Sequence, residues 1–373
     1  MLAARRVAGK RILDLTAANP TRAGFAYPEA EILAALASPA ALVYEPDPRG
    51  LPAARAAISA YYASRGESVG ATDLLLTAST SESYALLFKL LAEPGDEILV
   101  PAPSYPLFEV LAALESVRLV RYPLCNAAEQ GWRIQREALE AALSPRTRAL
   151  IVVHPNNPTG SYVRADERAW LEALCASRGL PLIADEVFLD YVRGAVHESS
   201  FATTRGALAF ALSGLSKLVG LPQLKLGWIA LAGEERVREQ ARERLEFIAD
   251  AYLSVGAPVQ HAAAALLGLR GAVQRQIRER VVGNEGRLRE RCAGVPDFRV
   301  LERAGGWYAV LELSESIDEE ALCVRLLERH GVLVHPGFFF DFARYGVLVL
   351  GLLAQPADLI EGIGRVIEST ESM

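Results

Sequence analysis

The hydrophobic and polar positions of this chain alternate, from about residue 73, between short apolar runs and longer amphipathic stretches. The apolar runs predict strands and the amphipathic stretches predict helices. Seven strands are expected, at DLLLT (73–77), DEILVPAP (96–103), VRLVRYPL (117–124), RALIVVHPNNPTG (148–160, ending in a turn), LPLIADEVF (180–188), RGALAFALSGLSK (205–217) and LKLGWIALAG (224–233). Strands that alternate with helices are typical of a mostly parallel sheet buried on both faces.

The pattern changes after about residue 233. Two long helical stretches, 234–256 and 259–292, are followed by a strand, a helix, two strands and a final helix between 298 and 369. This set is sufficient for a smaller α+β domain. The sequence therefore predicts an α/β protein with a large domain over residues 30–262. A second part would combine an N-terminal arm, 1–29, with a small C-terminal domain, 263–373.

Charge and cysteine usage narrow the class of protein. The formal net charge is −6 over 373 residues, which does not favour binding to nucleic acid. No apolar run reaches the length of a membrane span. The four cysteines lie far apart and the five histidines show no metal-ligand spacing, so neither a disulfide framework nor a metal site is expected. We expect a reduced, cytoplasmic protein.

Polar residues gather where the predicted strands end. Ser79, Tyr105, Asn157, Asp185 and the stretch 213–217 each follow an apolar run. In open parallel sheets the ligand binds beyond the carboxyl ends of the strands. These residues are therefore the candidates for a binding site.

Four motifs stand in one order along the chain: YEPDPRGLPAARAAISAYY (44–62), HPNNPTG (154–160), ADEVF (184–188) and SGLSK (213–217). Each alone has an ordinary reading, since Asn, Pro and Gly form turns and an aspartate after a strand often caps a helix. Together, at this spacing, they resemble the class I/II aminotransferases. These are fold-type I enzymes that use pyridoxal 5′-phosphate (PLP), and the resemblance covers nearly the whole chain.

The resemblance assigns a role to each polar residue. Lys217 matches the lysine that forms a Schiff base with PLP. Lysine suits this role because its amine can be made neutral by its surroundings. Asp185 matches the carboxylate that keeps the pyridine nitrogen protonated. Asn157 matches the residue that hydrogen-bonds the ring hydroxyl oxygen. Tyr105 matches the aromatic residue that stacks on the ring.

The resemblance also implies a phosphate site and a homodimer. TASTSES (77–83) matches the loop that opens a helix and holds the phosphate, with Thr80 and Ser81 as the expected contacts. Tyr44 matches a tyrosine that reaches the phosphate of the partner subunit.

Three positions near the cofactor depart from the family pattern. Lys225 stands eight residues after Lys217, where the family has an arginine, and it offers charge without bidentate geometry. Gly214 replaces a common serine, with Ser213 beside it as the expected cofactor contact. Phe188 replaces a tyrosine, so one hydrogen bond to the ring hydroxyl oxygen is lost. We expect this loss to raise the pKa of the Schiff base.

The largest departure concerns the substrate. Val349, in YGVLVLGLL, stands where the family arginine binds the substrate α-carboxylate. A buried carboxylate without this partner would bind poorly. Three explanations stay open. Another arginine replaces the family arginine, either Arg344 or Arg22, which lies with Asn19 in the N-terminal NPTRAGF segment. Alternatively, the substrate lacks an α-carboxylate, or the protein no longer acts on amino acids.

The sequence thus predicts a PLP-dependent aminotransferase that moves an amino group from an amino acid or related amine to a keto acceptor. Two alternatives stay open. One is a PLP-dependent decarboxylase or β-lyase, because the fold does not fix the bond that is broken. The other is a non-catalytic PLP-binding protein, which the intact Lys217, Asp185 and Asn157 disfavour.

Overall fold

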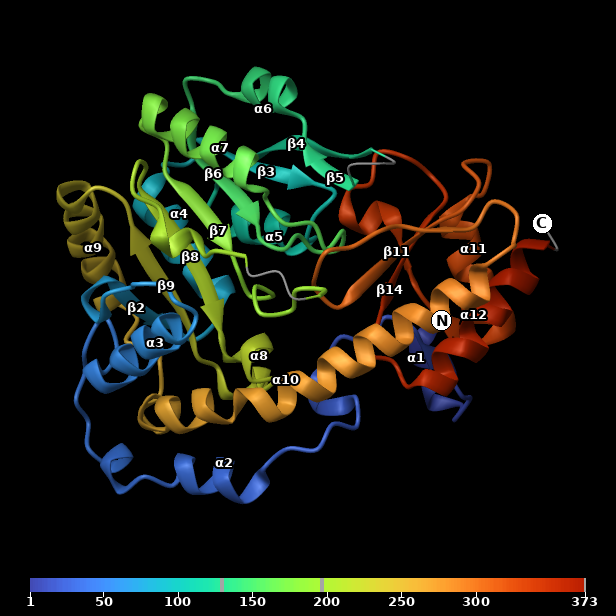
Figure 1. Cartoon of the computed structure of the whole chain (residues 1–373), viewed down its shortest axis with the longest axis horizontal. Helices are drawn as coiled ribbons and strands as arrows, with labels where there is room; N and C mark the ends of the chain where they lie inside the picture. Colours follow the sequence, from blue (N-terminus) through green and yellow to red (C-terminus); the bar gives the residue numbers. More distant parts are fainter. Residues whose placement is uncertain (128–130, 195–197, 372–373) are drawn as a thin grey trace.

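The computed structural model describes residues 1–127, 131–194 and 198–371. A large sheet flanked by helices forms one part of the molecule and a smaller sheet with its own helices forms the other (Figure 1). The long helix α10 (Ala257–Cys292) runs diagonally from the first part to the second. No helix in the described ranges is both long and apolar enough to cross a membrane.

The large sheet has eight strands in the order β2-β9-β8-β7-β6-β3-β4-β5. Pairings from β4 through β3, β6 and β7 to β8 are parallel, and the outer pairings of β9, β2 and β5 are antiparallel. Their bounds are β2 (Leu74–Thr77), β3 (Glu97–Ala102), β4 (Arg118–Ala127), β5 (Gly131–Ile134), β6 (Thr147–Val153), β7 (Leu182–Asp185), β8 (Ala209–Gly214) and β9 (Gly227–Ala232).

The expectation of seven strands was therefore one too few. The added strand, β5, has four residues and pairs antiparallel with the end of β4 at the sheet edge. Trp132 and Ile134 alternate with Gly131 and Arg133, but two apolar residues are too few to distinguish a strand from a loop in the sequence.

Successive residues of the central strands face two separate cores. In β6, Leu150 and Val152 belong to one core cluster, whereas Ile151 and Val153 belong to the other. This alternation follows from the two-residue period of a strand. The first core is covered mainly by α3 (Pro52–Ser64), α6 (Arg136–Ala142), α7 (Ala165–Arg178) and the start of α10; the second by α4 (Thr80–Leu91), α5 (Leu107–Leu114) and α9 (Glu235–Asp250).

The small sheet has the order β10-β11-β14-β13 and is antiparallel. The single strand expected from 298 onward is divided in two, because Gly306 takes a left-handed backbone conformation between β10 and β11. The elements are β10 (Arg299–Val300), β11 (Tyr308–Glu312), α11 (Glu319–Arg325), a π-helical turn (Leu326–His330), β12 (Val332–Leu333), β13 (His335–Pro336), β14 (Val347–Gly351) and α12 (Pro356–Glu371).

The N-terminal arm packs on the small sheet. It comprises α1 (Leu2–Val7) and β1 (Leu13–Asp14), and β1 pairs with β12. The chain then passes through a 3₁₀ turn, η1 (Pro20–Arg22), to α2 (Glu29–Leu36). The predicted domain boundary at residue 262 falls inside α10, whose early residues join the first large-sheet core and whose residues from Val273 onward join the small-domain core.

Candidate active site

Lys217 lies in the short helix α8 (Leu215–Leu218), directly after β8. Gly214 precedes this helix and pairs with Gly227 across β8 and β9. The two strands approach closely here, because a Cβ on Gly214 would lie only 2.9 Å from the Leu226 carbonyl oxygen. The Lys217 amine lies 5.4 Å from the ring centroid of Phe188 and 5.0 Å from that of Trp307. Burial lowers the pKa of this amine to about 8, although the charge of Asp185 acts in the opposite direction.

Asp185 ends β7, and its carboxylate is buried. One oxygen accepts a hydrogen bond from the Val187 amide (3.2 Å) and the other from the Tyr84 hydroxyl (3.1 Å). Burial raises the pKa of Asp185 to about 6, and the two hydrogen bonds and the positive charge of Lys217 lower it in part. The site therefore holds a carboxyl and an amine whose pKa values both move toward neutrality.

Asn157 is presented by a loop that its neighbour Asn156 fixes. The Asn156 amide nitrogen donates to the Pro103 carbonyl (3.0 Å) and to the Thr159 hydroxyl (2.9 Å), and its oxygen accepts from Ser104 (3.1 Å). Asn156 thereby joins the NPTG loop to the segment that carries Tyr105. The Oδ1 atom of Asn157 is buried and has no hydrogen-bond partner among the described residues.

The first turn of α4 lies at the opposite end of the site. The Ser79 hydroxyl caps this helix by accepting from the Glu82 amide (3.2 Å). Thr80 and Ser81 are its first two residues. Gly227 allows β9 to approach this turn, since a Cβ there would lie 3.2 Å from the Ser79 carbonyl carbon. A helix N-terminus of this kind binds anions through its free amide groups.

These elements enclose one cavity of about 250 Å³ beyond the carboxyl ends of the strands. Six of the residues to which the family resemblance assigned a role line it: Thr80, Ser81, Tyr105, Asn157, Asp185 and Lys217. Their neighbours in the lining include Ser79, Phe188, Gly214, Ser216 and Tyr308.

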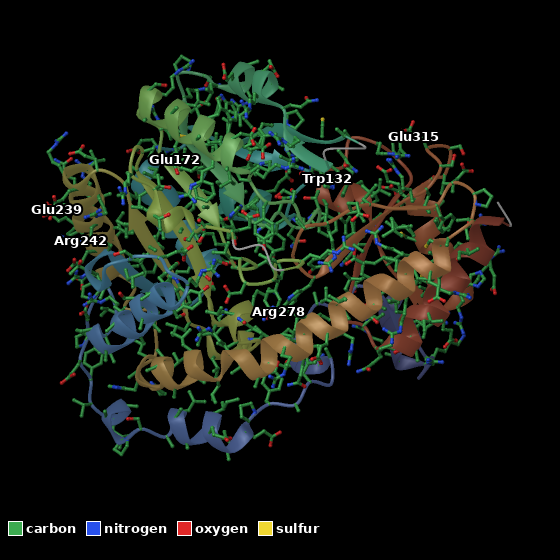
Figure 2. The ribbon with its side chains drawn as sticks, viewed as in Figure 1. Trp132, Glu172, Glu239, Arg242, Arg278 and Glu315 are labelled. Atoms are coloured by element: carbon green, nitrogen blue, oxygen red, sulfur yellow. The ribbon has the colours of Figure 1, made fainter. Side chains whose placement is uncertain are left out.

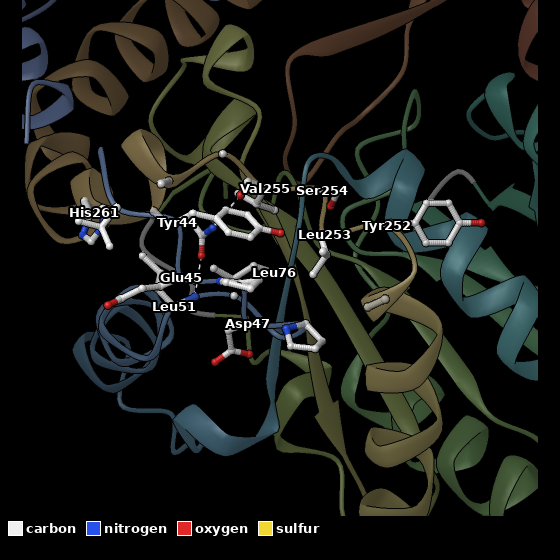
Figure 3. A pocket seen from close by; sticks show the side chains of 18 of the residues that line it. Tyr44, Glu45, Asp47, Leu51, Leu76, Tyr252, Leu253, Ser254, Val255 and His261 are labelled. Carbon is white, nitrogen blue, oxygen red and sulfur yellow. Dashed lines mark hydrogen bonds between the residues drawn. The ribbon is translucent and has the colours of Figure 1, made fainter. Parts of the chain in front are cut away.

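Three further candidates lie outside this lining. Ser213 is buried in β8 opposite Trp228. Lys225 is exposed, with a left-handed backbone conformation. Tyr44 is 79% exposed and lines a different cavity of about 270 Å³, together with Leu76, Leu253 and other residues (Figure 3).

The candidate substrate residues also lie outside the lining. Val349 is fully buried in β14, between Val310 and His335 of the neighbouring strands. Asn19 caps η1 by accepting from the Thr21 amide (3.1 Å), and Arg22, in the same turn, is exposed and forms no ion pair with any described residue.

Arg344 is held by the small domain. Its guanidinium pairs with Glu312 (3.1 Å) and Glu315 (3.4 Å). Glu312 is four residues along β11 from Tyr308, which is roughly 13 Å at the rise of a strand. Glu315 lies at the edge of the small domain and away from α8 (Figures 1 and 2).

Sequence reasoning assigned no individual role to four residues around the lysine and the aspartate. Tyr84 bonds Asp185, Trp307 lies beside the Lys217 amine, and Ser216 and Tyr308 line the cavity. Tyr84 and Trp307 read as ordinary core positions in their elements. Only Ser216, inside the SGLSK motif, carried a usable signal.

The residues present fit PLP. Asn157, whose buried side-chain oxygen has no partner among the described residues, lines the same cavity as the buried Asp185 and Lys217. The described residues contain no cluster able to hold a metal ion. The class defined by this arrangement is that of the fold-type I PLP enzymes. Its parts are a lysine amine, a buried carboxylate at the strand ends and a helix N-terminus for a phosphate.

The comparisons with known proteins give the family. Residues 13–348 match the family described as aminotransferase class I and II, and this chain belongs to that family. Alanine aminotransferase of Mycobacterium tuberculosis is 30% identical, over 96% of this chain and 85% of its own. Glutamate-pyruvate aminotransferase AlaA of Haemophilus influenzae is 29% identical, over 96% of this chain and 91% of its own. The protein is thus a transaminase of a PLP-dependent family.

A solved structure supports the same fold. Alanine aminotransferase from Pyrococcus furiosus superposes with a TM-score of 0.90 at 24% identity, over 100% of this chain and 96% of that one.

Proposed function

We propose that the chain binds PLP covalently through Lys217 and transfers an amino group from an amino acid such as alanine or glutamate to a keto acid. The observation that supports this most directly is the convergence of Lys217, Asp185, Asn157 and the α4 N-terminus on one cavity. The substrate class is taken from the relatives, which are named for alanine, glutamate and pyruvate.

Each group in the cavity has a defined task in this proposal. Asp185 pairs with the pyridine nitrogen, Asn157 donates to the ring hydroxyl oxygen, and Tyr105 covers a face of the ring. Thr80 and Ser81 bind the phosphate with the first amides of α4. Ser213 and Lys225 remain predicted cofactor contacts, and their positions outside the lining make them weaker candidates.

When bound, PLP supplies an electron sink for the carbon that loses its proton. Lys217 Nζ removes that proton and later returns one, as general base and then general acid. An amine with a pKa near 8 is suited to both tasks, because its neutral and charged forms are both populated near neutral pH. Phe188 and Trp307 keep water from one side of this amine.

The substrate carboxylate is assigned to Arg22 in preference to Arg344. Arg344 is engaged by two carboxylates, whereas the Arg22 guanidinium is unpaired in the described structure. The segment that carries Arg22 begins against β14, where Ala17 contacts Gly351. It reaches the loop after α8, where the Tyr27 hydroxyl donates to the Gly220 carbonyl (2.8 Å). In this proposal Arg22, in the turn that Asn19 caps, reaches the substrate carboxylate from this segment.

We also propose a homodimer in which Tyr44 reaches the partner's site. Exposed apolar side chains surround this tyrosine, among them Leu42, Val43, Tyr252 and Leu253. A patch of this kind favours association with another chain. We place the protein in the reducing cytoplasm, on the ground that its cysteines lie far apart in the sequence.

A spectroscopic half-reaction tests the proposal. The purified protein loaded with PLP is mixed with L-alanine or L-glutamate, and the visible absorbance of the cofactor is followed. Conversion to the amine form, reversed by pyruvate, supports transamination. Release of carbon dioxide or pyruvate without this cycle would instead indicate the decarboxylase or β-lyase. Lys217→Ala should lose the reaction, and Lys89→Ala, a change of the same kind outside the cavity lining, should keep it.

A further inference from the structure

The hydroxyl of Tyr84 bonds the carboxylate of Asp185, the residue proposed to pair with the pyridine nitrogen of PLP. Tyr84 belongs to α4, is 2% exposed and does not line the cavity. Its hydroxyl donates to Oδ2 of Asp185 at 3.1 Å. Within the described ranges it is the one side-chain donor to this carboxylate. Tyr84 therefore has no direct contact with the cavity, and its polar contact with the site is Asp185.

Two donors fix the orientation of the Asp185 carboxylate. The Val187 amide bonds Oδ1 and the Tyr84 hydroxyl bonds Oδ2, so each oxygen is held from a different element. The amide belongs to the chain that follows β7 and cannot be altered by a side-chain change. Tyr84 is therefore the donor in this arrangement that a substitution can remove.

The ring of Tyr84 is itself held in place. It packs against Phe88 at 5.9 Å and edge-on against Phe108 at 5.3 Å between centroids. Phe108 also contacts Tyr105, which lines the cavity. Because this packing restricts rotation of the ring, the hydroxyl stays directed at the carboxylate. A buried hydroxyl donates a stronger hydrogen bond to a charged carboxylate than to a neutral acceptor.

We infer that Tyr84 is a positioning residue for the transaminase: it holds the Asp185 carboxylate in the orientation and charged form that bind the protonated pyridine nitrogen of PLP. This inference rests on the proposed cofactor site. The groups that face Asp185 are Tyr84 from α4, Tyr105 before α5 and Lys217 from α8. Burial raises the pKa of Asp185, and Tyr84 opposes this rise by stabilising the ionised form.

The test uses Tyr84→Phe, which removes the hydroxyl and keeps the ring. Tyr122→Phe is the matched control, because Tyr122 is equally buried and its hydroxyl donates to the Ile151 carbonyl (2.7 Å) instead of to a carboxylate. In the apo protein, ¹³C-labelled aspartate carboxyl groups are titrated by NMR, with Asp185→Asn identifying the signal. We expect Tyr84→Phe to raise the pKa of Asp185 by about one unit, a tenfold change in proton affinity. We expect Tyr122→Phe to leave it unchanged.

The second readout is the affinity of the apo protein for PLP. Tyr84→Phe should weaken binding by about fivefold or more, as expected for loss of a hydrogen bond to a charged group. In an Asp185→Asn background the same change should have no further effect, because Tyr84 would then have no carboxylate to position. A general loss of stability would not produce this dependence on Asp185.

Three results would overturn the inference. The first is an unchanged pKa of Asp185 in Tyr84→Phe, and the second is an equal shift in Tyr122→Phe. The third is unchanged PLP affinity despite a shifted pKa. Failure of the wild-type protein to bind PLP would contradict the proposed function itself. That failure is distinguishable from the three results above, because the titration of the Asp185 carboxyl group is done on the apo protein and needs no cofactor.

Discussion

Gly160, the last residue of the NPTG motif, ties the cofactor loop to the small domain. Its carbonyl accepts hydrogen bonds from the amides of Ala304 (3.1 Å) and Gly305 (2.8 Å). Its backbone has φ of +68°, and a Cβ would lie 2.4 Å from the Gly305 carbonyl oxygen. Ordinary contact begins at 3.4 Å, so an alanine forces a shift of about 1 Å between two backbone segments.

The free-energy cost of Gly160→Ala has two sources. A left-handed conformation costs a residue with a Cβ about 1–2 kcal/mol. Forcing extra volume into a packed region costs about 1–3 kcal/mol. We therefore expect the free energy of unfolding to fall by about 2–5 kcal/mol. PLP affinity should fall with it, because Asn157 lies in the same loop.

Gly179→Ala separates the two costs. Gly179 ends α7 with φ of +60°, and an added Cβ meets nothing within 4 Å. This variant should lose only the conformational part and keep its affinity for PLP. The assay is urea unfolding of the apo protein, followed by tryptophan fluorescence. If Gly160→Ala is no less stable than Gly179→Ala, the close approach of the two loops is wrong.

Three further predictions follow from the same geometry. Phe188→Tyr should lower the pKa of the Schiff base by adding a donor near the ring hydroxyl oxygen, and a pH titration of the absorbance without a shift would refute this. Arg303→Met should cost about 2 kcal/mol of unfolding free energy, because the buried Glu285 loses its partner at 2.6 Å and keeps only Arg289 at 3.1 Å and Arg193 at 3.7 Å; urea unfolding measures this loss, and an unchanged midpoint would contradict it. Because folding raises the pKa of Asp185 from 3.8 to about 6, the folded apo protein binds this proton more tightly than the unfolded chain, so stability should fall by about 2 kcal/mol as pH rises from 4 to 7. Asp185→Asn should lose this part of the pH dependence, and equal slopes for both proteins would count against it.

The sheet could be predicted from the sequence because its strands are buried on both faces. Continuous apolar runs such as LIVV in β6 cannot be mistaken for a surface segment. Strand order could not be predicted in the same way. The antiparallel pairing of β2 with β9 joins segments about 150 residues apart, and nothing local in either strand encodes it.

Residues in motifs were easier to predict than residues that act through packing. Lys217, Asp185 and Asn157 stand at or shortly after the ends of strands, where a polar side chain is conspicuous. Tyr84 stands inside an amphipathic helix, where a tyrosine usually belongs to the core. Its contact with Asp185 joins residues 101 positions apart and depends on how α4 packs against β7.

The chain has four lysines, at positions 10, 89, 217 and 225, and this permits a direct test of the central claim. The purified protein loaded with PLP is reduced with borohydride, digested and mapped by mass spectrometry. The proposed site predicts a stable phosphopyridoxyl group on the peptide that contains Lys217 and none in Lys217→Ala. A reduced adduct on Lys10, Lys89 or Lys225 instead, or an adduct of equal yield in Lys217→Ala, would contradict the assignment.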